Sequence, residues 1–355
     1  MSLTLASNPP LRLHWHWAWL TPLVLFMAVM AGTSIGETSI PMDTIFKVLA
    51  NQLWGAGYAV DRIDAGIVWN YRLSRAILAG CCGAGLALAG VVLQALLRNP
   101  LADPFLMGIS AGASTGAVAV TIAGLGAGAV TLSLGAFAGA GLAFGLVVLL
   151  AHAAGSGTGG GRGTQAAGAI ILAGIAGSQL FNALTAFIIA RSASAEQARG
   201  IMFWLMGNLS GVRWDDVRLG LPAAFAGLLV CLWHRRALDA FTFGADSAAS
   251  LGIPVRRVRG MLIASMALVT AVMVSMVGAI GFVGLVIPHA MRFIVGSRHT
   301  RLVPASALAG AVFLIGADII SRIIVPGQVL PIGVVTALVG APAFAVILIR
   351  GSRVR

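Results

Sequence analysis

The sequence predicts an all-α protein that crosses a membrane many times, and three observations predict this. Of the 355 residues, 59% are hydrophobic and only 10% are charged, against about 25% charged in an ordinary soluble domain. The mean hydropathy is +0.96. Apolar runs of about 20 residues, the length that spans a bilayer, recur along the chain. The composition therefore excludes a soluble enzyme, a nucleic-acid-binding domain and a disordered protein.

Ten hydrophobic spans lie between breaks that contain glycine, proline or charged residues. The span 282–296 is short and contains Pro288, so a broken or only partly crossing helix is expected there. Residues 1–355 are expected to form a single transmembrane domain. The predicted spans are 17–35, 74–97, 104–124, 128–151, 167–190, 219–234, 260–280, 282–296, 302–321 and 332–350.

The basic residues predict the orientation of the chain. The formal net charge is +12, and Lys and Arg concentrate in the cytoplasmic loops of membrane proteins. With both termini in the cytoplasm, the cytoplasmic segments contain 14 basic and 3 acidic residues, and the opposite side contains 9 and 8. This asymmetry favours an even number of spans with both termini inside. We expect the first span to be a retained helix, although charge alone does not exclude a cleaved signal peptide.

Two segments between spans, 37–71 and 192–217, are predicted to lie on the outer side. In the first, Leu49, Leu53 and Trp54 are expected to line one face of a short surface helix. The second contains Trp204 and Trp214. Tryptophan at such places usually marks the boundary between lipid and water. For each tryptophan, anchoring at this boundary is therefore favoured over a role as a substrate platform.

The chain lacks residues that would supply energy for transport. A phosphate-binding loop ends in Lys followed by Ser or Thr, whereas the single lysine, Lys47, precedes Val48. Ion-coupled transport usually places carboxylates inside spans, but the acidic residues fall in loops or at span ends, with Asp103 and Asp318 closest to the hydrocarbon. No catalytic triad or metal-binding set occurs at motif spacing. We expect a conduit that is not itself an enzyme, has no cofactor, and needs a partner motor and a partner that delivers substrate.

Three arginines are predicted to lie at the outer ends of spans. Arg72 and Arg75 are one helical turn apart and share a face, and Arg322 ends the ninth span on the same side. Exposed guanidinium groups can dock the carboxylates of an acidic partner and orient it. Anchoring to lipid phosphates is the alternative.

An inner loop, 238–259, has the pattern of two short amphipathic helices separated by Gly244. Such helices can insert into a cleft on a cytosolic motor. The alternative is an ordinary basic loop, because Arg256, Arg257 and Arg259 end the segment. The residues expected to contact the motor are Phe243, Gly244, Ala248, Leu251, Gly252 and Ile253.

A polar cluster ends the second span at the cytoplasmic mouth and runs from Gln94 to Pro104. Pro100 and Pro104 forbid a continuous helix through it. Glycines then recur every fourth residue from Gly108 to Gly116, which lets another backbone approach closely. A kinked, tightly packed segment that acts as a gate is expected here.

These residues belong to a longer series of sequence blocks: Arg72–Arg75, Gly90–Gln94, Asn99–Pro104, Trp204–Gly207, Gly278–His289, Ala317–Asp318, Pro331–Thr336 and Gly340–Pro342. In this order they resemble the signature of the FecCD permeases. These are the membrane subunits of type II ABC importers for haem, iron-siderophore and cobalamin. The similarity covers nearly all of residues 37–350, and its several long blocks make it specific.

The resemblance implies a BtuC-like fold with ten helices per subunit, a homodimer in the bacterial inner membrane, and a periplasmic binding protein. It also implies two cytoplasmic ATPase subunits, which hold ATP and Mg. The expected cargo is haem or a ferric siderophore, with haem slightly preferred on overall resemblance because no residue specifies it. A cobalamin permease of the same architecture and an ion-coupled secondary transporter are the alternatives.

The resemblance also implies roles for particular residues. In the family, arginines that match the three outer ones pair with glutamates on the binding protein. The segment that matches 238–259 contacts the ATPases, and residues that match Asn99 and Leu101 help to close the gate. The expected gate residues are therefore Asn99, Pro100 and Leu101. One departure is visible: many members have a glutamate where this chain has Val329. A local salt bridge near Arg322 is therefore in doubt.

Overall fold

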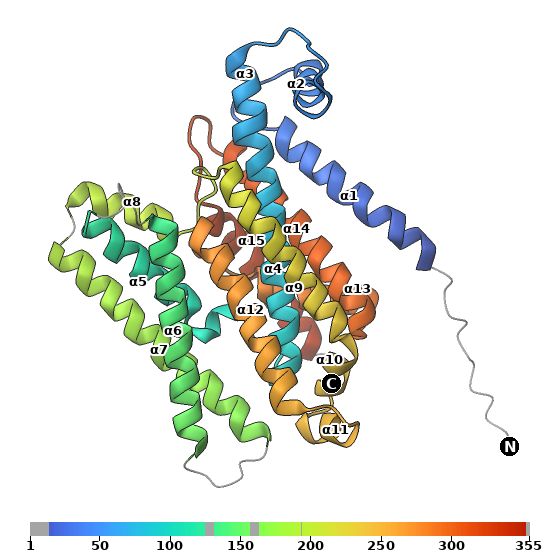
Figure 1. Ribbon diagram of the computed structural model, residues 1–355, viewed down its shortest axis with the longest axis vertical. Coiled ribbons are helices and arrows are strands. Elements are labelled where there is room, and N and C mark those ends of the chain that lie inside the picture. The colour runs from blue at the N-terminus through green and yellow to red at the C-terminus, as the bar shows by residue number, and fades with distance from the viewer. Residues whose placement is uncertain (1–13, 125–130, 157–162, 193, 353–355) are drawn as a thin grey trace, which may run out of the picture.

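The computed structural model describes residues 14–124, 131–156, 163–192 and 194–352, and within them the regular structure is entirely helical. A helix lies at each of the ten predicted spans (Figure 1). These helices are α1 (His14–Ser34), α4 (Ser74–Leu97), α5 (Ile109–Ile122), α6 (Leu132–Ser156), α7 (Gly163–Ser192), α9 (Trp214–Trp233), α12 (Val255–Val277), α13 (Val283–Val295), α14 (His299–Ile323) and α15 (Ile332–Ser352).

Length and composition suit these helices to a bilayer. Among the described residues, six helical segments are long and apolar enough to cross a membrane, and four apolar segments are shorter. The longest of the six is Arg62–Leu97, in which α3 (Arg62–Gly66) and the π-helical η1 (Ile67–Leu73) continue directly into α4. The all-helical membrane architecture predicted from composition is therefore confirmed.

Helix α4 lies at the centre of the bundle, and nearly all of its residues are buried. Glycines allow its neighbours to approach. A Cβ atom added at Gly83 would lie 2.0 Å from the carbonyl oxygen of Gly310 in α14, and one at Gly90 would lie 1.9 Å from that of Gly284 in α13. No side chain fits at such distances. Helix packing in lipid relies on close backbone contact of this kind, because apolar side chains gain little by leaving an apolar solvent.

Helices α5, α6 and α7 pack together beside this core. The glycines spaced by four residues in α5 face glycines of α6, because a Cβ at Gly112 would lie 2.3 Å from the Gly139 oxygen and one at Gly116 would lie 2.0 Å from the Gly135 oxygen. The predicted close approach is therefore confirmed. The short 3-10 helix η2 (Pro104–Met107) joins this group to α4.

The two ends of the bundle carry different short helices (Figure 1). Helix α2 (Met42–Trp54) and α3 lie at one end, which we call the α2 end, and α10 (Arg235–Phe241) and α11 (Ala245–Ser250) lie at the other, the α10 end. The short surface helix expected around Leu49, Leu53 and Trp54 is thus confirmed as α2. The remaining short helix, α8 (Ala195–Leu205), begins with a capping box between Ser194 and Gln197.

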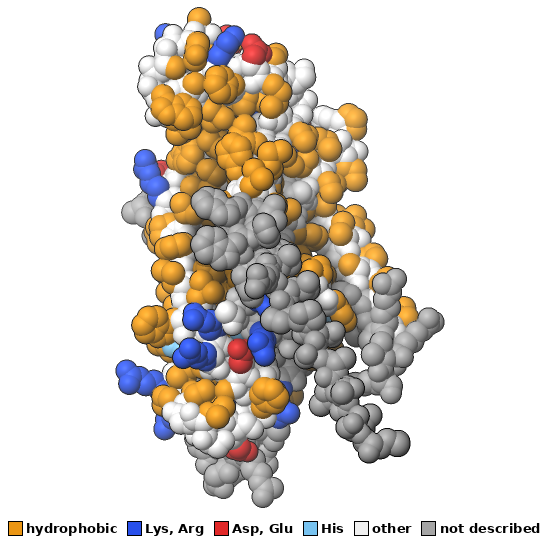
Figure 2. Space-filling model, turned by 90° about the vertical axis from the view of Figure 1, so that its right-hand side faces the viewer, with side chains coloured by type: hydrophobic (Ala, Val, Ile, Leu, Met, Phe, Trp, Pro, Cys, Tyr) orange, Lys and Arg blue, Asp and Glu red, His pale blue; other side chains and the backbone are white. Residues whose placement is uncertain are grey.

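The outer surface is apolar along the bundle and basic at one end. Large exposed hydrophobic side chains occur on most of the spanning helices, for example Leu142 on α6 and Leu172 on α7. Figure 2 shows one face on which hydrophobic side chains extend from the α2 end towards the middle, and several Lys and Arg side chains gather towards the α10 end. The exposed arginines near that end include Arg236, Arg256 and Arg257.

Candidate functional site

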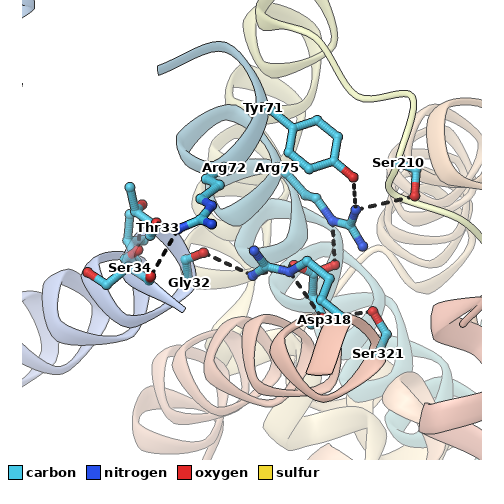
Figure 3. Close-up of polar contacts among 11 residues, drawn as sticks. Gly32, Thr33, Ser34, Tyr71, Arg72, Arg75, Ser210, Asp318 and Ser321 are labelled. Carbon is cyan, nitrogen blue, oxygen red and sulfur yellow. Dashed lines mark hydrogen bonds and ion pairs between the residues drawn. The ribbon is translucent and has the colours of Figure 1, made fainter. Parts of the chain in front are cut away.

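Near the α2 end, one carboxylate binds two guanidinium groups inside the bundle (Figure 3). Arg75 Nε donates to Asp318 Oδ1 at 2.7 Å, and Arg322 Nη2 lies 3.0 Å from Asp318 Oδ2. All three side chains are 1% exposed. Arg75 lies in the first turn of α4, whereas Asp318 and Arg322 lie one turn apart in α14, so the Arg75–Asp318 pair joins the two helices.

The same two arginines also bind groups on other elements. Arg75 Nη1 donates to the Tyr71 hydroxyl at 2.9 Å and to Ser210 Oγ at 3.3 Å. Arg322 Nη2 donates to the Gly32 carbonyl at 2.9 Å. The network therefore joins α1, α4, α14 and the loop before α9. Because two cations share one anion, the site has a net positive charge away from water.

Arg72 caps the C-terminal end of α1. Its Nη1 donates to the Ser34 carbonyl at 3.0 Å, and its Nη2 binds both the carbonyl and the hydroxyl of Thr38. The last carbonyls of a helix have no partner within it and carry its negative dipole end, so a guanidinium group satisfies both needs. Gly36 makes room, because a Cβ there would lie 2.9 Å from the guanidinium group.

The expectation that these three arginines are exposed is wrong. Arg72, Arg75 and Arg322 are at most 2% exposed, and each binds groups of its own chain. Their partners were hard to predict, since Asp318 follows Arg75 by 243 residues. The sequence feature that could have pointed to this partner is that Asp318 is an acidic residue at the end of a span. The doubt about a salt bridge near Arg322 is also resolved, because Asp318 supplies the carboxylate that position 329 lacks. Docking to glutamates of a partner stays a prediction.

The predicted gate residues form a compact turn between α4 and η2. Asn99 Oδ1 accepts from the Leu101 amide at 2.9 Å, and the Asn99 carbonyl accepts from the Ala102 amide at 3.1 Å. Arg98 ends α4 in the left-handed region, with φ of +50°. Leu101 and Pro100 are exposed at the surface. The helix thus ends where the two prolines predicted a break, and nothing in this geometry tests a gating role.

Gln94 holds this turn against α13, a role that the sequence did not reveal. Its Nε2 lies within 3.2–3.3 Å of the carbonyl oxygens of Ala102, Gly284 and Leu285, and its Oε1 accepts from Arg292. A buried amide without partners would be costly, so these contacts stabilise one position of the turn. The sequence feature that could have pointed to this role is that Gln94 is a polar residue at the end of an apolar run.

Asp103 caps the 3-10 helix η2 from the end of the turn. Its Oδ1 accepts from the Phe105 amide at 2.8 Å. Burial raises the pKa of the Asp103 carboxyl to about 6, and the Phe105 hydrogen bond acts in the opposite direction. The carboxyl therefore remains mostly ionised at pH 7, where it can accept this bond.

At the α10 end, the segment 238–259 forms the two short helices that the pattern predicts, α10 and α11. They are separated by Gly244, whose φ of +113° is accessible mainly to glycine. Phe243 and Leu251 are 76% and 72% exposed, whereas Ala248 is buried. Large apolar groups left in water on a short helical projection are typical of a contact surface.

The other predicted contact residues of this segment lie in two settings. Ile253 is partly buried and packs against the central core, so it is less accessible than Leu251. Gly252 is exposed and has φ of +78°, which ends α11. A Cβ atom added at Gly244 would lie 3.5 Å from Arg98 Nη1. The segment therefore lies beside the start of the turn that contains Asn99.

A cavity of about 530 Å³ lies among α5, α7 and α8, and the sequence did not predict it. Its polar groups are hydroxyls and one amide, and none of its lining side chains is charged. The described residues contain no cluster of His, Cys, Asp and Glu that could hold a metal ion. The lining residues are Phe105, Ser110, Ala111, Ser114, Ser178, Asn182, Thr185, Ala186, Ile189, Leu205 and Ala279.

Comparison with known proteins identifies the architecture. The model of the FecCD transport family matches residues 23–350. That match includes the arginine cluster, the turn and the segment 238–259. The chain belongs to the FecCD transport family. Members of this family are transmembrane permease subunits of ABC transporters, in which partner subunits hydrolyse ATP.

Curated relatives of this FecCD permease cover most of its length. An uncharacterised ABC transporter permease, YvrB of Bacillus subtilis, is 37% identical over 330 residues, which are 93% of this chain and 92% of the relative. The cobalamin import system permease BtuC of Halobacterium salinarum is 40% identical over 282 residues, 79% of this chain and 73% of the relative.

A solved structure has the same fold. It is an inward-facing conformation of a metal-chelate type ABC transporter, with 27% identity and a TM-score of 0.78. The match covers 94% of this chain and 98% of the other. The BtuC-like fold expected from the resemblance is therefore confirmed, and the chain is a multi-pass membrane permease.

Proposed function

We propose that this permease is one half of a homodimer that imports a bulky metal chelate, driven by two ATPase subunits that bind ATP and Mg. The observation that carries the proposal is the projection formed by α10 and α11, whose exposed Phe243 and Leu251 have no partner within the described chain that buries them. A permease without a nucleotide-binding loop needs such a contact to receive energy. Membership of the FecCD family supports the same assembly.

The orientation follows from the surface charge. Exposed arginines, including Arg236, Arg256 and Arg257, lie at or beside the α10 end. Positive charge marks the cytoplasmic side. We therefore place the α10 end in the cytoplasm of a bacterial cell, with the chain in the inner membrane, both termini cytoplasmic, and a periplasmic binding protein at the α2 end.

The turn at Asn99, Pro100 and Leu101 is proposed as the cytoplasmic gate. It lies beside the coupling segment at Gly244, and Gln94 holds it against α13. These contacts give the turn two neighbours whose movement would displace it. Docking of binding-protein glutamates by Arg72, Arg75 and Arg322 remains part of the proposal, and the burial of these groups means that docking must first expose them.

Cobalamin is the first cargo to test, and haem or a ferric siderophore the second. The Halobacterium relative is a cobalamin permease, which supports cobalamin over the preference for haem that overall resemblance suggested. The hydroxyl and amide groups of the α5–α7–α8 cavity can hydrogen-bond a large ligand without holding it by a fixed charge. Such weak binding suits a pathway that must release its cargo.

The test is transport by a reconstituted complex. The permease would be placed in liposomes with its ATPase subunits and its binding protein, and uptake of cyanocobalamin, haemin and a ferric hydroxamate would be measured with and without ATP. We expect ATP-dependent uptake of one of these chelates. Uptake by the permease alone, driven by a proton or sodium gradient, would support the ion-coupled alternative and contradict the proposal.

A further inference from the structure

Asp239 joins the coupling segment to the far longer helix α14. It lies on α10, and its Oδ1 accepts from the backbone amide of His299 at 2.9 Å and lies 2.7 Å from His299 Nδ1. His299 is the first residue of α14 and follows Asp239 by 60 residues. Because a carboxylate only accepts hydrogen bonds, the Nδ1 atom that faces it carries the proton.

The chemistry of a helix terminus favours this contact. The first amides of α14 have no partner within the helix, and its dipole is positive there. A carboxylate from another helix satisfies one of these amides and the dipole together. The imidazole of His299 is 1% exposed and its Nε2 has no hydrogen-bond partner among the described residues, so this ring is held by its bond to Asp239.

The α10 side of the contact is also anchored. Leu238 and Phe241, on either side of Asp239, are buried in the central core. Asp239 itself is about a third exposed, since its side chain has 37% of its surface accessible. A force applied to the exposed Phe243 therefore acts on a short helix whose carboxylate binds the start of α14.

Helix α14 can carry a displacement to the other end of the molecule. It packs against α4 at the Gly83–Gly310 contact, where the two backbones touch with no side chain between them. Near the α2 end it carries Asp318 and Arg322, which bind Arg75 of α4. One stiff element thus connects the segment at the α10 end with the buried ion pairs at the opposite end.

From this geometry we propose that Asp239 and His299 are positioning residues that couple movement of α10 and α11 to α14. Through α14, binding and hydrolysis of ATP on the ATPase subunits displace the buried arginine cluster. In the other direction, docking of the binding protein changes ATP hydrolysis by the ATPase subunits. The inference rests on the proposed function, because it concerns how the assembly proposed above passes a signal through the membrane.

The test compares Asp239→Ala, Asp239→Asn and His299→Ala in the full complex with its ATPase subunits and binding protein, reconstituted in liposomes. The readout is the stimulation of ATP hydrolysis by the binding protein, together with basal hydrolysis and co-purification of the ATPase subunits. Thr300→Ala is the control, because Thr300 is exposed and follows His299 in α14, outside the α10–α11 projection.

We expect Asp239→Ala and His299→Ala to lower the stimulation by at least about fivefold, the lower end of usual coupling between two sites, while basal hydrolysis and co-purification persist. Asp239→Asn keeps an oxygen that can accept from the His299 amide, so it should fall between Asp239→Ala and the unsubstituted complex. Thr300→Ala should behave as the unsubstituted complex does.

Two results would overturn the inference. One is full stimulation in both alanine variants. The other is loss of basal hydrolysis or of co-purification in Asp239→Asn as well as Asp239→Ala, which would show a contact needed only for folding. Absence of any stimulation in the unsubstituted complex would contradict the proposed function itself, so the two failures are distinguishable.

Discussion

Arg75, Asp318 and Arg322 form a buried site in which each charge depends on the others. Removing water from a charge is costly, and the cost is met only when partners are close and well oriented. Asp318 offsets this cost for two guanidinium groups: its Oδ1 lies 2.7 Å from Arg75 Nε, and its Oδ2 lies 3.0 Å from Arg322 Nη2. At the residue scale, the first role of these arginines is therefore to join α4 and α14.

The substitution Asp318→Asn should strongly destabilise the protein. It leaves two buried cations without an anion, and breaking a buried pair typically costs about 3–5 kcal/mol. Asp215→Asn is the control, because Asp215 pairs with Arg218 at 2.8 Å on the surface and such pairs contribute little. Thermal unfolding of the detergent-purified proteins would measure the difference. Equal melting temperatures for the two variants would contradict the structural role and favour docking.

Among the helices, glycine contacts decide how closely α14 approaches α4. The side chain that alanine adds at Gly310 would lie 2.3 Å from the Gly83 oxygen and 2.8 Å from the Ala87 Cβ. The two helices would have to separate along their whole contact. At this scale the absence of a side chain, rather than its chemistry, sets the packing.

Gly310→Ala should therefore destabilise the protein by about 1–3 kcal/mol, the usual cost of overpacking. Gly316→Ala, on the same helix, should leave stability unchanged because nothing lies within 4 Å of its added Cβ. Thermal unfolding of the two purified variants tests this. A Gly310→Ala protein as stable as Gly316→Ala would show that α14 can shift without loss.

The α10–α11 projection separates residues for contact from residues for folding. Phe243→Asp and Leu251→Asp change exposed side chains, so we expect a folded permease that no longer co-purifies with its ATPase subunits. Leu238→Asp places a charge at a fully buried position and should prevent folding. Co-expression followed by affinity purification of the permease measures both effects. Normal recovery of the ATPases with both exposed variants would argue against this contact surface.

The whole molecule is polarised, with arginines gathered at the α10 end and the α2–α3 hairpin of helices at the other. A lipid bilayer accepts the apolar middle, and the charge asymmetry selects which end faces the cytoplasm. In the proposed assembly each partner has its own end: we expect the ATPases at α10 and α11 and the binding protein at the α2 end.

Cysteine labelling tests this orientation. Arg257→Cys and Lys47→Cys introduce thiols at opposite ends, and Cys81, Cys82 and Cys231 are buried, so background reaction should be low. A membrane-impermeant maleimide should label Lys47→Cys in intact spheroplasts and Arg257→Cys only after the membrane is opened. The reverse pattern would mean that the α10 end faces outward.

Much of the fold was predictable because the signals are local. An apolar run of membrane-spanning length is sufficient to predict a helix in lipid, where backbone groups must bond within their own segment. The break at Pro100 and Pro104, the glycine spacing that begins at Gly108, and the two helices around Gly244 were predicted for the same reason. The expected ten spans all correspond to helices.

The sequence by itself determined the helices, their breaks, the membrane and the family, because each depends on residues near one another in the chain. Only the tertiary structure decided that the outer arginines are buried, that Asp318 serves two of them, and that Asp239 caps α14. Asp239 and His299 are 60 positions apart in the chain, and Arg75 and Asp318 are 243 positions apart. An arginine at a span end looks the same in sequence whether it faces a partner, a phosphate or a carboxylate inside the bundle, and packing alone selects among them.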